Sequence, residues 1–433
     1  MADHNTNNTT THRRPRSIDE HDEHDEPLSN TPGHRVTIRS VRSLCGAQHT
    51  QNPNGGGIFL GNEHHHHEPL SIFECVKVIL FATRINILLL FIPLGIIASK
   101  LHWAPVTVFV LNFIAIIPLA KLLGYATEEI AMRLGDNLGA LLNASFGNAV
   151  ELILSIVALK EGKIDVVQAS VLGSVLSNLL LVLGFCFICG GYKFQQQKFN
   201  QTAAQTSSSL LSLSCLSLLI PAAFVATAKE IDHQDHIQSL SYGTSVVLLV
   251  VYVLYLLFQL KTHTHLYATE NEEEEAPLLP IWMSIALLLL VTLVVALCAE
   301  FLVDSIEGLS ESWHISPTFI GLILLPIVGN AAEHVTAVTV AMKNKMDLAI
   351  GVAVGSSMQI ALFVTPLMVI IGYFIGQPMT LFFNTFETCI MFVSVLIVNY
   401  LIQDGESNWL EGVQLLSTYV IIAIAVFYYP TDA

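Results

Sequence analysis

The sequence has little charge of either sign and few basic residues. Only 12% of its 433 residues are charged, and 19 Lys and Arg stand against 35 Asp and Glu, so the formal net charge is -16. Nucleic-acid binding needs clustered basic residues, and their absence excludes that class of partner. The seven cysteines are scattered through apolar segments and give no zinc or disulfide framework. An HExxH motif and a convincing nucleophile arrangement are also missing, so we assign no catalytic residue and expect no enzyme.

Apolar residues, by contrast, are abundant. They make up 53% of the chain, and the mean hydropathy is +0.60, which is the composition of a protein that crosses a membrane many times. Residues 1–70 are the exception, because Asn, Thr, His, Pro, Gly and charged residues predominate there. Such a segment cannot bury enough apolar surface to offset the entropy of ordering, so we predict a disordered tail. It also lacks the pattern of a secretory signal, so the first span is expected to direct membrane insertion.

About eleven stretches approach the roughly 20 apolar residues needed to cross the hydrocarbon core. Short connections such as KEGK at 160–163 and KNKM at 343–346 indicate antiparallel neighbours. The sequence therefore predicts an all-α, polytopic membrane protein. The predicted spans are approximately 85–99, 105–132, 138–159, 165–190, 206–228, 240–260, 279–303, 316–342, 347–375, 379–402 and 409–429.

Basic residues at the ends of these spans predict the orientation. Several arginines precede the first span, and placing them in the cytosol also places Arg133, Lys193 and Lys261 there. This arrangement follows the positive-inside preference. An odd number of spans then puts the C-terminus across the membrane, and the acidic run ENEEEE at 270–275 faces the cytosol with the N-terminus.

The chain contains an internal repeat. Sliding residues 147–180 along 329–362 without a gap matches identical polar and glycine residues, and a weaker match aligns Glu128 with Glu300. Setting the first span aside leaves two halves of five spans, and an odd count per half predicts inverted repeats, which meet at a central transport site. The matched pairs include Gly147 with Gly329, Asn148 with Asn330, Glu151 with Glu333, Asp165 with Asp347, Gly173 with Gly355 and Ser174 with Ser356. The predicted organisation is a tail at 1–70, a first span with its flanks at 71–104, a repeat at 105–261, an acidic linker at 262–278 and a second repeat at 279–433.

The repeated motif predicts a cation site. An ionised carboxylate is costly in hydrocarbon, so Glu151 and Glu333 should face a polar cavity or a ligand. Asn148 and Asn330 each precede a glutamate by three residues and therefore share its helix face. Two carboxylates and two amide oxygens are hard ligands that favour calcium over soft metals.

Further residues are expected around this site. The glycines at 147 and 329 weaken the helices at the motif, and the next span of each half offers polar side chains. An acid on the preceding span of each half, and the histidine beside the second glutamate, are candidates for a proton path or gate. Helix packing is the alternative for any single polar residue here. The predicted lining residues are Gly147, Gly329, Ser174, Ser177, Ser356 and Gln359, and the path or gate residues are Glu128, Glu300 and His334.

Burial disfavours the charged form of a carboxylate, so an empty site exposed to an acidic compartment should take up protons, and a bound divalent cation should expel them. A protein that alternates access only when its acids are neutralised is an antiporter. A divalent-cation channel also needs acids in a pore, and a sodium-coupled exchanger remains open as well.

The segments GNAVELILS (147–155) and GNAAEHVTAV (329–338), followed by VLGSVLSN (171–178) and VGSSMQIALF (354–363), resemble the cation/proton exchangers, the CAX branch of the calcium/cation antiporter superfamily. They are most similar to fungal vacuolar calcium/proton exchangers, over residues 80–430. A sodium/calcium exchanger is expected to carry serine, threonine and proline around its acids.

The resemblance implies a vacuolar antiporter that moves cytosolic calcium into an acidic lumen, without a prosthetic group. Some members of the branch also accept manganese, and a homo-oligomer is compatible with the family. The family's central acids fall on Glu151 and Glu333, its outer acids on Glu128 and Glu300, and its histidine on His334. The acidic run, with Glu272, Glu273, Glu274 and Glu275, corresponds to a regulatory cytosolic segment.

Overall fold

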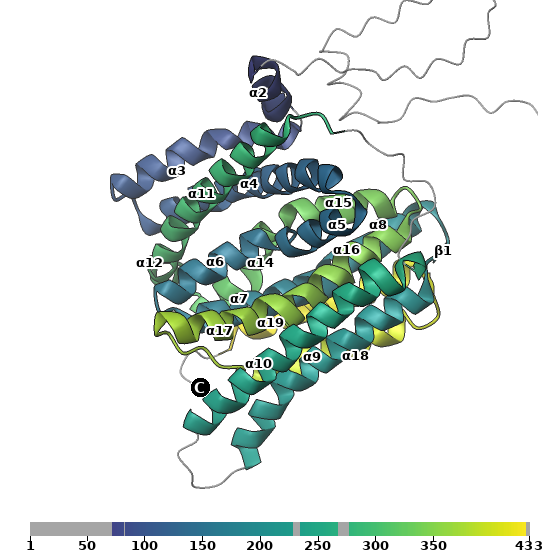
Figure 1. Ribbon diagram of the computed structural model, residues 1–433. Coiled ribbons are helices and arrows are strands. Elements are labelled where there is room, and N and C mark those ends of the chain that lie inside the picture. Colours follow the sequence, from purple (N-terminus) through teal and green to yellow (C-terminus); the bar gives the residue numbers. More distant parts are fainter. Residues whose placement is uncertain (1–71, 82, 228–233, 267–276, 430–433) are drawn as a thin grey trace, which may run out of the picture. The chain divides into compact units, whose positions relative to one another are not determined.

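The computed structural model describes residues 72–81, 83–227, 234–266 and 277–429. The predicted tail at 1–70 and the acidic residues Glu272, Glu273, Glu274 and Glu275 lie outside the described residues. Within them the chain is almost entirely helical, with a single pair of short antiparallel strands (Figure 1). The prediction of an all-α protein is therefore confirmed.

The elements up to residue 266 follow the predicted spans, except that the short helix α2 was not predicted. They are α2 (Ile72–Phe81), η1 (Arg84–Leu90), α3 (Phe91–Lys100), α4 (Pro105–Leu134), α5 (Asp136–Phe146), α6 (Ala149–Lys160), α7 (Ile164–Leu176), η2 (Ser177–Val182), α8 (Leu183–Lys193), β1 (Gln197–Lys198), α9 (Gln201–Thr227), α10 (Gln234–Leu257), η3 (Phe258–Thr262) and η4 (Thr264–Leu266).

The second half resembles the order from α4 onward, but its short helix α12 and its π turn η5 have no counterpart in the first half and were not predicted. Its elements are α11 (Ile281–Asp304), α12 (Ile306–Trp313), α13 (Pro317–Phe319), η5 (Ile320–Leu324), α14 (Leu325–Gly329), α15 (Ala331–Ala341), α16 (Met346–Gln359), η6 (Ile360–Val364), α17 (Thr365–Ile375), α18 (Thr385–Leu401), β2 (Glu406–Ser407) and α19 (Trp409–Phe427).

Both copies of the repeated motif lie where a helix is interrupted. In the first half α5 ends before Gly147 and α6 begins after Asn148, whose backbone has φ -101° and ψ 30°. In the second half α14 ends at Gly329 and α15 begins after Asn330, which has φ -96° and ψ 3°. Each motif asparagine therefore occupies the N-terminal boundary of the helix that carries the motif glutamate. Two spans predicted as single helices, 138–159 and 316–342, are broken here.

The helix that follows each broken helix contains a π-helical turn. In the first half this turn is η2, between α7 and α8, and in the second half it is η6, between α16 and α17. Single π turns inside α-helices are rare and are frequent at functional sites. Ser177 begins η2, and Gln359 immediately precedes η6, so both turns lie at predicted lining residues. These turns could not be predicted from the sequence, because a π turn does not change the hydrophobic pattern of a helix.

Membrane-spanning helices are numerous in the described part of the chain. Seven single helices are long and apolar enough to cross a bilayer, and nine spans result if each of two bent helix pairs is one span. The helix Thr385–Leu401 is apolar but shorter, and the broken run α5–α6 has helices of only 11 and 12 residues. A polytopic helical membrane protein is thus confirmed, and the count of about eleven spans stays a prediction.

The broken helices lie between two groups of longer helices. In Figure 1, α3, α4 and α11 lie on one side of them, and α9, α10 and α18 lie on the other. The contacts agree, because α11 packs on α4 and α6, while α9 packs on α16 and α18. Helices α7, α8, α16 and α17 form the heavily buried middle, which places the repeated motifs deep inside the protein.

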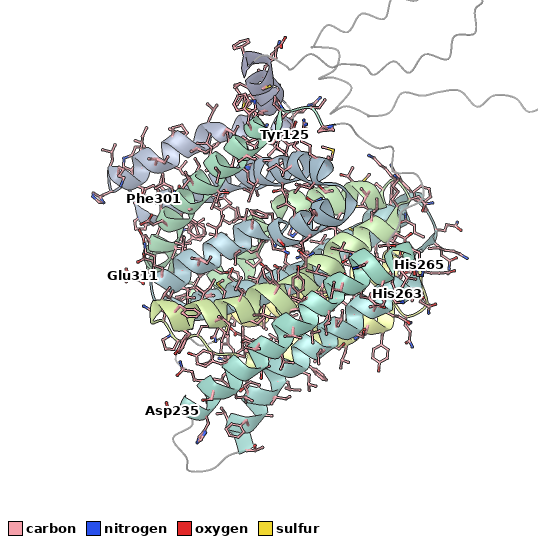
Figure 2. All side chains as sticks on the ribbon, viewed as in Figure 1. Tyr125, Asp235, His263, His265, Phe301 and Glu311 are labelled. Atoms are coloured by element: carbon pink, nitrogen blue, oxygen red, sulfur yellow. The ribbon has the colours of Figure 1, made fainter. Side chains whose placement is uncertain are left out.

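A buried glutamate ties α4 to the start of α11. Glu129 is 1% exposed and accepts hydrogen bonds from the backbone N–H groups of Leu278 and Leu279 at 2.9–3.1 Å. The hydroxyl of Tyr125, labelled in Figure 2 beside the start of α11, donates to the same carboxylate at 3.1 Å. Arg133 donates to the Leu279 carbonyl. This role of Glu129 could not be predicted from the sequence, because the groups that it binds are backbone N–H groups about 150 residues away.

Glycines permit a close approach between α7 and η5, which belong to the two halves. A Cβ atom placed on Gly173 in α7 would lie 2.1 Å from the carbonyl oxygen of Leu322 in η5. A Cβ on Gly321 would lie 2.8 Å from the Cβ of Ala169. Small residues commonly allow membrane helices to approach this closely. The contact holds η5, and with it the second motif, against α7.

Candidate cation site

The two broken helices bring both motif glutamates to one place. The Glu151 Oε1 atom lies 2.8 Å from the position that a Cβ would take on Gly329. The Glu333 Oε1 atom lies 3.9 Å from the corresponding position on Gly147. Each carboxylate therefore reaches the glycine of the opposite motif, and the two are close enough to interact electrostatically. The structure places the predicted pair together, with Glu151 buried and Glu333 partly buried.

The motif asparagines also pair across the two halves. Asn330 Nδ2 donates to Ser174 Oγ at 3.3 Å and to the Pro326 carbonyl at 3.1 Å. The matching interaction in the other direction joins Ser356 Oγ to Asn148 Oδ1 at 2.7 Å. Each asparagine thus contacts the serine carried by the π-containing helix of the opposite half. The repeat predicted these four residues as equivalents, and the structure brings them together in pairs.

The two sides of the site differ in their hydrogen bonding. On the side of Asn148 and Glu333, which we call the closed side, Ser356 Oγ also lies 3.2 Å from Glu333 Oε2, and Asn148 Nδ2 donates to Gln359 Oε1 at 2.7 Å. Asn178 Nδ2 donates to Ser356 Oγ at 3.1 Å. The hydroxyl and amide groups on this side are therefore hydrogen-bonded to one another.

On the side of Asn330 and Glu151, the open side, two oxygens are left over. Glu151 Oε1 and Asn330 Oδ1 are buried and have no hydrogen-bond partner among the described residues. Their side chains are only 5% and 1% exposed. An unpaired polar atom buried away from water is costly, and its presence in a native structure calls for a ligand or water. The donor set of this side consists of hard oxygens, which suits a divalent cation such as calcium.

The remaining predicted lining residues lie on the same helices. Ser177 is fully buried at the first position of η2, and Gln359 is partly buried at the matching position of the second half. Within the described chain, three or more His, Cys, Asp or Glu side chains nowhere cluster as a metal site. The acidic groups brought together here are the two carboxylates, with amide and hydroxyl oxygens beside them.

The comparisons with known proteins agree with this geometry. A family model described as "sodium/calcium exchanger protein" matches residues 104–261 and 283–428. The chain belongs to this exchanger family. The two matched ranges coincide with the two halves that share the broken helices. The vacuolar calcium ion transporter of Schizosaccharomyces pombe is 51% identical over 380 residues, which cover 86% of this chain and 92% of the relative.

Two further proteins extend the comparison. A Ca(2+)/H(+) antiporter of Aphanothece halophytica is 48% identical over 358 residues, covering 79% of this chain and 96% of that protein. A crystal structure of the Ca2+/H+ antiporter protein YfkE is similar with a TM-score of 0.67 and 38% identity, covering 80% of this chain and 99% of that one. The transporter fold is therefore shared along nearly the whole described chain.

The residues predicted for a proton path in this exchanger differ in their surroundings. Glu128 and Glu300 are exposed on α4 and α11. Glu300 lines a cavity of about 330 Å³ between α6 and α11, together with Lys160 and Glu161. His334 is partly buried next to Glu333, and its Nε2 atom has no hydrogen-bond partner in the described part of the chain.

Replacement of Gly329 by alanine should weaken calcium binding. The added Cβ would lie 2.8 Å from Glu151 Oε1, so the flexible carboxylate must move away from the site. We expect the KM for calcium to rise about tenfold. This corresponds to a loss of roughly 1.4 kcal/mol of binding free energy when one charged ligand is misplaced. Initial uptake rates in proteoliposomes give the measurement. Gly351→Ala is the control, since a Cβ there meets nothing within 4 Å; equal KM values for both variants contradict the placement of Glu151.

Proposed function

We propose that this exchanger family member is a secondary antiporter that moves calcium out of the cytosol in exchange for protons, by alternating access. The observation that carries this proposal is the pair of facing carboxylates, Glu151 and Glu333, with Glu151 Oε1 and Asn330 Oδ1 buried and without partners among the described residues. Such a site can be neutralised by one divalent cation or by protons, but not by both together. Mutual exclusion between the two ions is the requirement for exchange.

The related proteins support calcium and protons as the two substrates. The relatives from Schizosaccharomyces pombe and Aphanothece halophytica are called a vacuolar calcium ion transporter and a Ca(2+)/H(+) antiporter. By the same reasoning the protein resides in the vacuolar membrane, where the proton gradient of an acidic lumen drives calcium from the cytosol into the vacuole. Its N-terminus is cytosolic, its two five-helix repeats are inverted, and manganese is a second cargo suited to the same oxygen ligands. It needs no prosthetic group and performs no enzymatic reaction.

A sodium-coupled exchanger is the second candidate, because the matching family model carries sodium in its description. The site itself favours protons. Sodium needs several oxygens that remain free for coordination, whereas the closed side has its hydroxyl and amides occupied by one another. A protonated carboxylate fits a side whose hydroxyl and amides are already hydrogen-bonded to one another, since it needs only a single acceptor.

Calcium uptake into proteoliposomes tests the proposal. Vesicles loaded at acidic pH and diluted into a neutral buffer with calcium should accumulate it, and a proton ionophore should abolish accumulation. An outward sodium gradient without a pH gradient should give none. Uptake driven by sodium identifies the second candidate. Calcium that only equilibrates down its own gradient, with or without the ionophore, identifies a channel and contradicts antiport.

A further inference from the structure

The two sides of the cation site are related by sequence but are not equal in structure, and one buried amide of the closed side has no polar counterpart in the repeat. The helices that follow the motifs read GSVLSN at 173–178 and GSSMQI at 355–360. Ser174 matches Ser356, but Asn178 matches Ile360. The closed side therefore has an amide where the open side has an aliphatic side chain that cannot form hydrogen bonds.

Asn178 determines what the Ser356 hydroxyl can do. Asn178 is 2% exposed, and its Nδ2 donates to Ser356 Oγ at 3.1 Å. A hydroxyl has one proton to donate and can accept through its lone pairs. Because an acceptor position is taken by Asn178, the Ser356 proton is directed toward the two oxygens that face it. These are Asn148 Oδ1 at 2.7 Å and Glu333 Oε2 at 3.2 Å.

Among the residues that the structure describes, no second amide donates to Ser174, the serine of the open side. Ser174 Oγ accepts only a longer hydrogen bond, of 3.3 Å, from Asn330 Nδ2. That contact uses the amide nitrogen of Asn330 and leaves its Oδ1 atom without a partner among the described residues. The carboxylate that packs on this side, Glu151, is likewise left with Oε1 unpaired.

We propose that Asn178 is a positioning residue that keeps the Ser356 hydroxyl as a hydrogen-bond donor and thereby makes the two sides of the cation site unequal. The free oxygens of Glu151 and Asn330 then meet the cation first. The closed side contributes only after the hydroxyl of Ser356 turns away from Asn148. This inference rests on the proposed function only in that the central site binds calcium.

Equilibrium binding of radioactive calcium to the purified protein tests the inference without requiring transport. Asn178→Leu keeps the volume but removes the donor, and we expect the Kd for calcium to change by about fivefold, the range of one hydrogen bond. Asn112→Leu is the matched control, because Asn112 is a fully buried amide in α4 whose Nδ2 bonds only the Val108 carbonyl. The control should leave the Kd unchanged, whatever its effect on yield.

Combined variants separate positioning from a merely structural role. If Asn178 acts through Ser356, then Asn178→Leu added to Ser356→Ala should change the Kd no further than Ser356→Ala alone. In the parent, Asn330→Ala should raise the Kd more than Asn148→Ala, and Asn178→Leu should make these two effects equal. Additive effects of Asn178→Leu and Ser356→Ala, or equal effects of the two asparagines in the parent, overturn the inference.

The outcomes also distinguish this inference from the proposed function. A parent protein that binds calcium but shows no proton-driven uptake contradicts the antiporter and leaves the binding comparison intact. Proton-driven uptake together with a Kd that is insensitive to Asn178→Leu contradicts the role of Asn178 alone. A parent protein that binds no calcium contradicts both the proposed antiport and the role of Asn178.

Discussion

Glu151→Gln and Glu333→Gln should each abolish proton-driven calcium uptake. Glutamine has nearly the same shape as glutamate, but it carries no charge and neither binds nor releases a proton. Each substitution leaves the cation with one negative charge fewer in a buried site, a loss of about 3 kcal/mol or more, equivalent to at least a hundredfold. The measurement is initial calcium uptake into acid-loaded proteoliposomes, normalised to the amount of folded protein.

An exposed acid provides the control for this comparison. Glu311 lies on α12, outside the site (Figure 2), and Glu311→Gln should transport at the parental rate. Glu129→Gln is unsuitable as a control, because Glu129 holds the start of α11. Gradient-driven uptake near the parental rate by either central variant contradicts the assignment of the paired carboxylates as the exchange site.

Much of this arrangement could be predicted from the sequence, because the two motifs share polar residues that apolar composition cannot explain. The repeated motif predicted two buried acids, Glu151 and Glu333, each accompanied by an asparagine amide. The inference that an internal repeat brings them together needed only the count of spans. The glycines at 147 and 329 indicated weakened helices at these points, since glycine does not favour a continuous helix, but the division of each span into two helices was not predicted.

Other features could not be predicted, because they depend on contacts between distant segments. The π turns η2 and η6 leave no trace in the hydrophobic pattern. Glu129 resembled its neighbour Glu128 in sequence, yet it is Glu129 that is buried on backbone N–H groups and Glu128 that is exposed. The inequality of the two sides also lay beyond the repeat, because matching residues such as Ser174 and Ser356 have different partners.

Matching glycines of the two halves also differ in their surroundings. Replacing them by alanine should therefore have very different effects on stability. Gly173 and Gly355 occupy matching positions in the repeat. A Cβ on Gly173 would meet the Leu322 carbonyl oxygen at 2.1 Å, whereas a Cβ on Gly355 meets nothing within 4 Å. Sequence alone therefore predicts equal tolerance of alanine at both positions, and the structure predicts a large difference.

Gly173→Ala should destabilise the protein by about 2 kcal/mol or more, because the methyl group forces α7 and η5 apart and their backbones cannot yield as a side chain can. Gly355→Ala should be neutral or slightly stabilising, since alanine favours a helix more than glycine does. Thermal unfolding in detergent, followed by loss of the monodisperse peak in size-exclusion chromatography, measures both. Equal melting temperatures for the two variants contradict the close approach of α7 and η5. Because η5 leads directly into the second motif, residual folded Gly173→Ala protein should also bind calcium more weakly than Gly355→Ala protein, which links this packing contact to the geometry of the cation site.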